Sequence, residues 1–158
     1  MDVQTLQTQW NETNNLIERW MEERQEILVK YCELTEITDF SESYTSKNST
    51  IHNFCGAMVD YVSLGHFEIF DRLIKEAELF GSQSDAQDHV HLLEEIQTTT
   101  EIILDFNDKY NQTDDLDSLV IDLASLGKTF VSRFADEDKL IDLLHSSNVG
   151  QLIANDPN

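Results

Sequence analysis

Apolar side chains recur at alternating intervals of four and three residues along the first segment of the chain. The series comprises Leu6, Trp10, Thr13, Ile17, Trp20, Arg24, Ile27 and Tyr31, and six of its eight members are apolar or aromatic. This spacing predicts a long helix over roughly residues 3–34. Leu16, Met21 and Leu28 widen the apolar side, which is typical of a helix that faces two neighbours in a bundle.

The pattern is lost between residues 35 and 49, where Ser, Thr, Asp and Glu are frequent. We expect an irregular connection here, with Ser49 or Thr50 as the N-cap of the next helix. That helix is predicted by the apolar side chains of Ile51, Phe54, Cys55, Met58, Val59, Tyr61 and Val62.

The second helical segment contains a conflict at Gly65. One straight helix through this glycine places Phe54, Met58, Phe67 and Phe70 on different sides. We therefore predict a kink or break near Gly65, followed by a helix over about residues 66–80. Gly81 follows the last apolar position, where many helices end in a left-handed residue.

Two further helices complete the prediction. Ser84-Asp85-Ala86-Gln87 has the pattern of a capping box and introduces a helix that extends to about Asn111. Residues 112–115 interrupt the apolar pattern, and a last helix carries apolar residues from Leu116 to Leu144. No segment shows the alternation of a strand, so the expected fold class is all-α.

The expected architecture is an antiparallel four-helix-type bundle with the break near Gly65. We predict a single helical-bundle domain over residues 1–148 and a frayed C-terminal tail over residues 149–158, where small and polar residues dominate. A single Pro, at position 157, is consistent with long uninterrupted helices.

The chain of 158 residues carries 10 Lys and Arg against 31 Asp and Glu, a net charge of −21 with His neutral. This charge argues against binding to nucleic acid or to anionic membranes, because both need a cationic surface. It favours a basic partner, although acidic surfaces also serve solubility. The apolar fraction of 40% is enough for a core.

The remaining composition fits a soluble protein of the cytoplasm. Cys32 and Cys55 form neither a disulfide framework nor a Cys-x-x-Cys pair, so we expect two reduced thiols. No apolar run approaches the roughly 20 residues that a membrane span requires. The N-terminus lacks the basic and apolar regions of a signal peptide.

Helical bundles can hold a di-iron site or a phosphotransfer histidine, and the sequence lacks the full pattern of either. A di-iron bundle needs a Glu-x-x-His motif on two helices, but the nearest fragments, Asp88-x-x-His91 and His91-x-x-x-Glu95, share one histidine. A phosphotransfer bundle needs an exposed histidine with a nearby cation, and His66 is surrounded by Asp60 and Glu68. We expect no catalytic residue, no metal and no cofactor.

Two features are consistent with either structure or binding. Trp20 lies between Arg19 and Arg24. It is either a core tryptophan, whose neighbouring arginines pair with Glu23 and Glu22 on the same helix, or part of a recognition site. The segment 60–68 concentrates polar and aromatic residues around the predicted break. Such a segment forms a helix–helix corner, and a corner can also expose a docking surface.

The segment Val59-Asp60-Tyr61-Val62-Ser63-Leu64-Gly65-His66-Phe67-Glu68 resembles the signature of the Rsd/AlgQ regulators of the bacterial RNA polymerase sigma factor. Three other segments resemble that family in the same order: Glu18–Arg24, Phe54-Cys55 and Arg133–Ile141. The resemblance covers about residues 10–145.

The resemblance implies an all-α anti-sigma factor without catalytic activity. Such a protein binds the C-terminal, DNA-binding region of the primary sigma factor, sequesters it from RNA polymerase and favours alternative sigma factors in slow growth. We expect a monomer that binds neither nucleic acid nor membrane. The alternative, a phosphotransfer or metal-binding bundle centred on His66 or His91, stays open.

The resemblance also implies a partner-binding surface. It comprises Asp60, Ser63, His66, Phe67 and Glu68, with Arg19, Trp20 and Arg24 lining the same side or supporting it. Asp60 is expected to pair with an arginine of sigma, and Phe67 is expected to act as an apolar anchor.

Overall fold

The computed structural model of the chain describes residues 2–37, 44–81, 86–112 and 115–154. Within these ranges the secondary structure is helical, without a strand. The elements are α1 (Val3–Thr35), α2 (Tyr44–Leu64), η1 (Gly65–Ile69), α3 (Phe70–Leu79), α4 (Ala86–Gln112), α5 (Leu119–Leu144), η2 (Ser146–Asn148) and α6 (Val149–Ala154). The predicted all-α fold class is confirmed.

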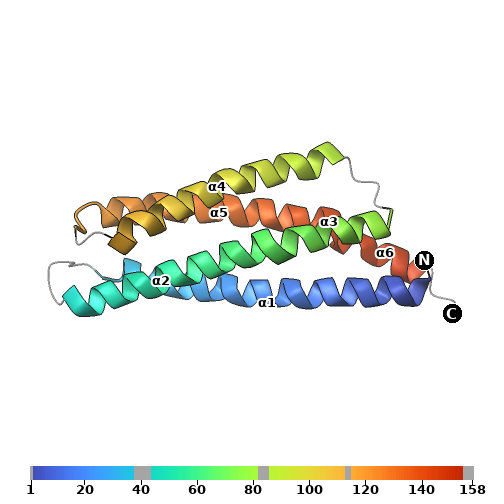
Figure 1. The fold of residues 1–158 in the computed structure, drawn as a ribbon, viewed down its shortest axis with the longest axis horizontal. Helices are drawn as coiled ribbons and strands as arrows, with labels where there is room; N and C mark the ends of the chain where they lie inside the picture. The colour runs from blue at the N-terminus through green and yellow to red at the C-terminus, as the bar shows by residue number, and fades with distance from the viewer. Residues whose placement is uncertain (1, 38–43, 82–85, 113–114, 155–158) are drawn as a thin grey trace.

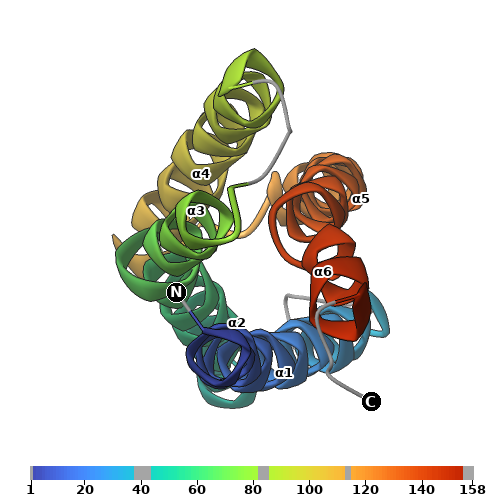
Figure 2. The ribbon, with the colours of Figure 1, turned by 90° about the vertical axis from the view of Figure 1, so that its right-hand side faces the viewer.

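The helices form an antiparallel bundle (Figure 1). α2, η1 and α3 follow one another as a single bent rod beside α1, while α4 and α5 form the other side of the bundle. α1 packs on α2, α2 on α4, and α4 on α5, and the short α6 returns to the first part of α1. The end-on view in Figure 2 shows α4 diverging from the other helices at its beginning.

The apolar series on the first helix faces the core, as predicted. Ile17, Trp20, Ile27 and Leu34 are buried, and the half-buried Tyr31 packs against the core cluster. Helix α1 begins after Asp2, whose carboxylate accepts a hydrogen bond from the Thr5 amide at 2.7 Å. This is an N-cap contact, which satisfies a donor that the helix itself leaves free.

The second helix begins earlier than its sequence pattern predicts. α2 starts at Tyr44, so neither Ser49 nor Thr50 is its N-cap. The residues before Ile51 have modest helix propensity, but propensity is a weak constraint once the following turns pack against a neighbour. Burial of Ile51, Phe54 and Cys55 stabilises the helix, and its first turns extend beyond the apolar stretch.

The break predicted near Gly65 is a π-helical turn. η1 continues the chain direction of α2, and its end is marked by a hydrogen bond from the Phe70 amide to the Gly65 carbonyl. One additional residue in a helical turn rotates everything that follows. The turn therefore lets Met58 and Ile69 both face the core while Phe67 faces outward, which resolves the conflict in the sequence.

The remaining boundaries agree with the sequence in most places. Gly81 has a φ of +60°, the left-handed conformation expected after the end of a helix. The predicted capping box at Ser84 and Asp85 lies outside the described residues, although α4 does begin at Ala86. No helix in the described ranges has the length and apolarity to span a bilayer.

A buried polar cluster fixes the C-terminal end of α5 to α1 and α3. The His145 ring stacks on Trp10 with 4.4 Å between ring centroids, and its Nδ1 lies 2.8 Å from a Glu76 carboxylate oxygen. Its Nε2 lies 3.1 Å from the Asn14 amide oxygen, so both ring nitrogens face acceptors. Asn148 donates a second hydrogen bond to Glu76, at 2.8 Å.

The chain continues as a helix beyond this cluster. Where the sequence predicts a frayed tail from residue 149, the structure has the short helix α6 up to Ala154, while residues 155–158 lie outside the described residues. The extent of the domain and of the tail in solution stays a prediction.

Two glycines of the same rod allow a matched test of the packing at the π turn. A Cβ at position 65 would lie 2.9 Å from Trp20 Cζ2, whereas a Cβ at position 56 meets no atom within 4 Å. We expect Gly65→Ala to lower the free energy of unfolding by roughly 1–3 kcal/mol through overpacking. Gly56→Ala should raise the free energy of unfolding by about 0.5–1 kcal/mol, because alanine favours the helix more than glycine does and its Cβ has free space at this position.

Urea unfolding of the two variants measures both effects. Equal changes for Gly56→Ala and Gly65→Ala would contradict the close approach of Trp20 to the π turn.

Candidate functional site

The signature residues gather on the outer side of the rod at the π turn. We define Asp60, Ser63, His66, Phe67 and Glu68 as the corner surface. Ser63 is half-buried and the other four are exposed. The Phe67 side chain is 75% exposed, and the His66 ring meets it edge to face with 4.9 Å between centroids. An aromatic group this exposed gains little within the fold, so it is available to a partner.

Trp20 lies beneath the corner surface and supports it. Its side chain has no exposed area, and its indole stacks on Tyr61 with centroids 4.8 Å apart and planes 12° apart. The indole N–H donates to the Tyr61 carbonyl at 3.0 Å, and Phe70 meets the indole edge to face. The interpretation of Trp20 as a core residue therefore describes its position, and its part in any binding surface is indirect.

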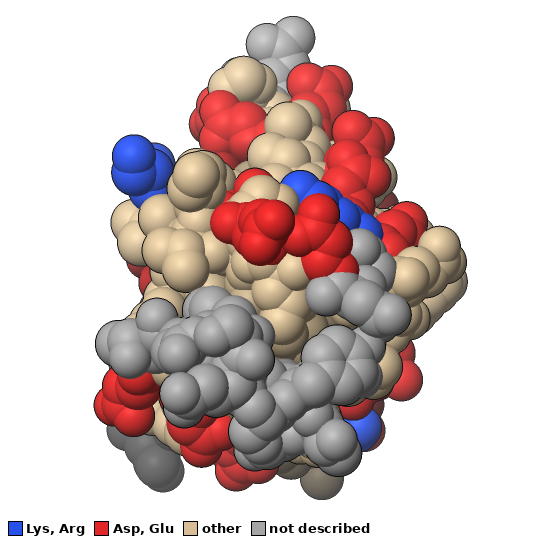
Figure 3. All heavy atoms as spheres, turned by 90° about the vertical axis from the view of Figure 1, so that its left-hand side faces the viewer, with Lys and Arg blue, Asp and Glu red and all other residues tan. Residues whose placement is uncertain are grey.

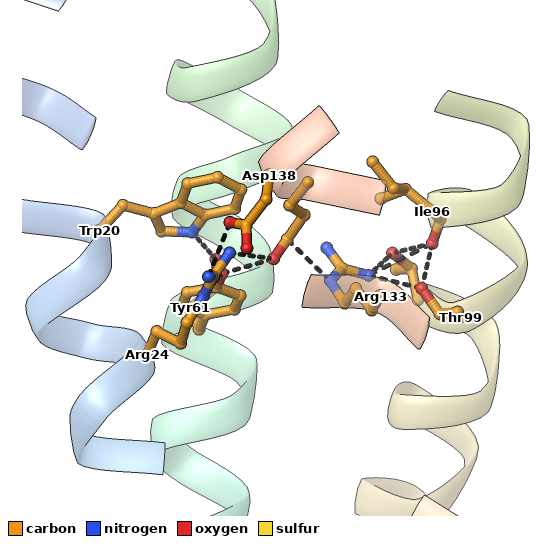
Figure 4. A network of polar contacts seen from close by, with 9 residues as sticks. Trp20, Arg24, Tyr61, Ile96, Thr99, Arg133 and Asp138 are labelled. Atoms are coloured by element: carbon orange, nitrogen blue, oxygen red, sulfur yellow. Dashed lines mark hydrogen bonds and ion pairs between the residues drawn. The ribbon is translucent and has the colours of Figure 1, made fainter. Parts of the chain in front are cut away.

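Arg24 connects α1 to α5 through a partly buried polar network (Figure 4). Its guanidinium lies 3.1 Å from a carboxylate oxygen of Glu137 and 2.8 Å from one of Asp138. Its Nε donates to the Tyr61 hydroxyl at 3.1 Å, and the Tyr61 hydroxyl donates to Glu137 at 2.5 Å. The guanidinium also lies over the Phe134 ring, 4.5 Å from its centroid. Arg24 thus pairs between helices, not with Glu22 on its own helix.

The network continues from Glu137 to α4 through Arg133. The Arg133 Nε donates to the second Glu137 oxygen at 3.0 Å, and both side chains are fully buried. The Arg133 Nη1 donates to the Ile96 carbonyl, the Thr99 hydroxyl and the Thr100 hydroxyl at 3.2, 3.1 and 2.6 Å. Glu137 therefore binds side chains of α1 and α2 directly and is joined to α4 through Arg133.

The charge of Glu137 depends on these partners. Burial raises the pKa of its carboxyl, while Arg133, Tyr61 and Arg24 act in the opposite direction by favouring the carboxylate. Burying a carboxylate without such partners is strongly unfavourable. The sequence resemblance includes Arg133 and Glu137, but it does not indicate that they bind Arg24 and Tyr61.

A groove of about 310 Å³ lies between α1 and α2, directly beside the corner surface. We call it the α1–α2 groove, and it is lined by Glu23, Glu26, Lys30, His52, Asn53, Gly56, Ala57 and Asp60. Asp60 therefore belongs both to the corner surface and to the groove. No sequence signal pointed to His52 or Gly56, because they lie opposite the predicted core positions.

Carboxylates crowd the junction of the groove and the corner surface. Burial raises the pKa of the Glu23 carboxyl, Arg19 lowers it, and Asp60, Glu26 and Glu68 raise it. One oxygen of Glu23 is buried without a hydrogen-bond partner among the described residues. The structure therefore brings Arg19 and Glu68 close to the same carboxyl, and the negative charge here exceeds the positive charge.

The two histidines of the alternative function have ordinary surroundings. His66 is exposed on the corner surface, and the nearby Arg72 binds Glu12, Gln9 and Thr13 instead. His91 pairs with Glu95 one turn further along α4, at 3.0 Å. Among the residues that the structure describes, no three His, Cys, Asp or Glu side chains converge on a possible metal position.

Arg24 and Arg19 provide a matched pair for the buried network. Arg24→Ala removes partners from Glu137, Asp138 and Tyr61, so we expect it to lower the free energy of unfolding by roughly 2–4 kcal/mol. Arg19 is exposed, and Arg19→Ala should leave the unfolding free energy almost unchanged. Denaturant unfolding followed by circular dichroism measures both, and a stable Arg24→Ala variant would show that the network is dispensable.

A second prediction concerns Asp136, which is buried on α5. Burial raises the pKa of its carboxyl, and the neighbouring Glu95 raises it further. The folded protein therefore binds this proton more tightly than the unfolded chain. The resulting stabilisation is present at low pH and is lost as the pH rises through the raised pKa.

Asp136→Asn removes this dependence. At neutral pH the variant should be more stable than the parent, and the difference should disappear at a pH below the usual range of aspartate pKa values. Urea unfolding over a pH series tests this, with Asp142→Asn on the exposed side of α5 as the control. If Asp136→Asn were less stable than the parent at neutral pH, the raised pKa of Asp136 would be contradicted.

The amino-acid sequence of the chain matches a known protein family. The family described as "Regulator of RNA polymerase sigma(70) subunit, Rsd/AlgQ" matches residues 1–145. A "Regulator of sigma D" from Yersinia pseudotuberculosis serotype O:1b (strain IP 31758) is 36% identical over 134 residues, which cover 82% of this chain and 79% of that protein. A "Regulator of sigma D" from Enterobacter sp. (strain 638) is 35% identical over 142 residues, which cover 87% and 84%.

The family match over residues 1–145 includes the corner surface, the buried network and most of the bundle, and the resemblance seen in the sequence is confirmed. The chain belongs to the Rsd/AlgQ family of regulators of the RNA polymerase sigma(70) subunit.

Proposed function

We propose that this protein is an anti-sigma factor that binds the C-terminal, DNA-binding region of the primary sigma factor. Binding through the corner surface would cover the region of sigma that contacts promoter DNA and keep it from RNA polymerase. The observation that carries this proposal is the exposed Phe67 on the π turn, which shares the corner surface with the exposed carboxylates of Asp60 and Glu68, in a chain of the sigma-regulator family.

The charge of the surface supports a basic partner. A DNA-binding domain presents cations to DNA phosphates, and the corner surface presents Asp60 and Glu68 beside Glu23 and Glu26 of the groove. Opposite charges accelerate encounter and disfavour wrong partners. The same charge makes nucleic acid a poor partner for the protein itself.

The α1–α2 groove suits one cationic side chain of that partner. An arginine or lysine placed in the groove would lie beside Asp60 and would offer a donor to the buried Glu23 oxygen. A cation there would also lower the pKa of Glu23, which its surroundings now raise. Phe67, at the other end of the corner surface, would be the apolar anchor.

The scaffold beneath the surface supports recognition without catalysis. Trp20 and Tyr61 hold the π turn in place, so little order is lost on binding. We propose that the protein acts by binding alone, as a monomer in the cytoplasm, where the polymerase works.

Substitutions on the corner surface test the proposal through binding to the purified C-terminal region of sigma. We expect Asp60→Ala to weaken binding by roughly 2–5 kcal/mol, mainly through faster dissociation, because the partner's cation loses its carboxylate. Phe67→Ala should cost about 2 kcal/mol of binding free energy or more if it is the central anchor.

Higher salt should slow association of the parent protein with sigma more than it speeds dissociation.

Matched controls separate the surface from general effects of charge and apolarity. Asp142→Ala removes an exposed carboxylate and Val131→Ala an exposed apolar side chain, both on α5 away from the corner. Both should bind sigma as the parent does.

The α1–α2 groove has a test of its own. Gly56→Gln, which places a side chain into the open groove, should weaken binding to sigma while the protein stays folded.

Melting temperatures of all variants accompany the binding data. Intact binding by Asp60→Ala and Phe67→Ala, or equal losses with the α5 controls, would remove the corner surface from the proposed site.

A further inference from the structure

A second groove lies between α4 and α5 and is apolar at its base. We call it the α4–α5 groove. It has a volume of about 240 Å³ and is lined by Ile102, Asp105, Phe106, Lys109, Asp122, Ser125 and Leu126. Phe106 and Leu126 are buried in the core, whereas Ile102 is 44% exposed at the edge of the groove. The groove is large enough for one leucine, methionine or phenylalanine side chain.

Apolar surface continues beside the groove on α5. Ile121 is 70% exposed and stands one helical turn before Ser125, which lines the groove. Single exposed apolar residues are normal on a protein surface, but apolar residues gathered around a hollow are characteristic of interaction sites.

The rim of the groove on α4 is negatively charged. Glu101, Asp105 and Asp108 are exposed at helical spacings of four and seven residues, so they share one side of α4. None of them forms an ion pair with another described residue, while the one cation of the groove, Lys109, is held by Asp122 at 2.7 Å. Figure 3, which views the end of the bundle where α4 stops and α5 starts, shows carboxylates covering much of its upper part.

We propose that the α4–α5 groove binds a basic amphipathic helix of a second protein partner. An apolar side chain of that helix would enter the groove between Ile102 and Leu126, and its Lys or Arg residues would face Asp105 and the neighbouring carboxylates. The charge excludes a second copy of the chain as a good occupant, because each copy carries −21. The proposal is independent of sigma binding, since the corner surface belongs to α2 and η1.

A synthetic helical peptide of leucine and lysine, with its leucines on one side, is the probe. Titration into the isotopically labelled full-length protein, followed by amide NMR, should shift resonances of α4 and α5 around the groove. Ser125→Trp, which fills the groove from its exposed edge, and Asp105→Lys, which reverses the rim charge, should each weaken binding by roughly tenfold or more. Asp142→Lys, with the same charge change elsewhere on α5, is the control and should weaken binding much less.

Two further peptides define the chemistry. A peptide with glutamates in place of the lysines should not bind, and a peptide of the same composition without an apolar side should bind much more weakly. Several results would overturn the proposal: equal binding by the Ser125→Trp variant, binding of the acidic peptide, or shifts confined to the corner surface. Concentration-dependent dimers that Ser125→Trp abolishes would assign the groove to a second copy instead.

Discussion

The buried carboxylate of Glu137 is the interaction on which the bundle depends. Helices α1 and α5 are not packed as closely as the other neighbouring pairs, and long side chains join them. Glu137 receives Arg24 from α1, Tyr61 from α2 and Arg133 from its own helix, and Arg133 in turn binds Thr99 of α4. A charge in the core is tolerable only with such partners, so the requirement to satisfy Glu137 fixes how the four long helices lie together.

The same requirement positions the corner surface. The Tyr61 hydroxyl is held by Glu137 and Arg24, and the Tyr61 carbonyl and ring hold the Trp20 indole. The indole occupies the space that only a glycine leaves at position 65, where the π turn begins. The exposed Phe67 is thus linked through two buried contacts to the centre of the bundle. A surface prepared in this way loses little conformational freedom when a partner binds.

Much of the fold follows from apolar periodicity. The first helix and the outward-facing polar residues were predictable because a helix repeats every 3.6 residues, and the conflict around Gly65 was visible because one helix cannot satisfy Phe54 and Phe67 together. The π turn itself was not predictable, since a kink, a break and an inserted residue all remove the same conflict. The start of α2 at Tyr44 also escaped, because tertiary packing extends helices beyond their apolar residues.

The candidate site was less accessible than the fold. The exposure of Asp60 and Phe67 was expected from the family signature, but Arg24 and Glu137 are 113 positions apart, and no local pattern joins them. The groove beside Asp60 arises where α1 passes Gly56, so it depends on how two helices approach. Such contacts between distant segments are properties of the assembled bundle, and the sequence of one helix does not contain them.

The central claim is that a rigid interior presents the corner surface to the C-terminal region of sigma. Hydrogen–deuterium exchange of the protein, alone and in complex with that region of sigma, tests this claim most directly. We predict slower exchange on binding in peptides that cover residues 60–68 and the facing part of α1, and unchanged exchange around Arg133 and Glu137, which the network already protects. Slower exchange confined to α4 and α5, with residues 60–68 unaffected, would contradict the account.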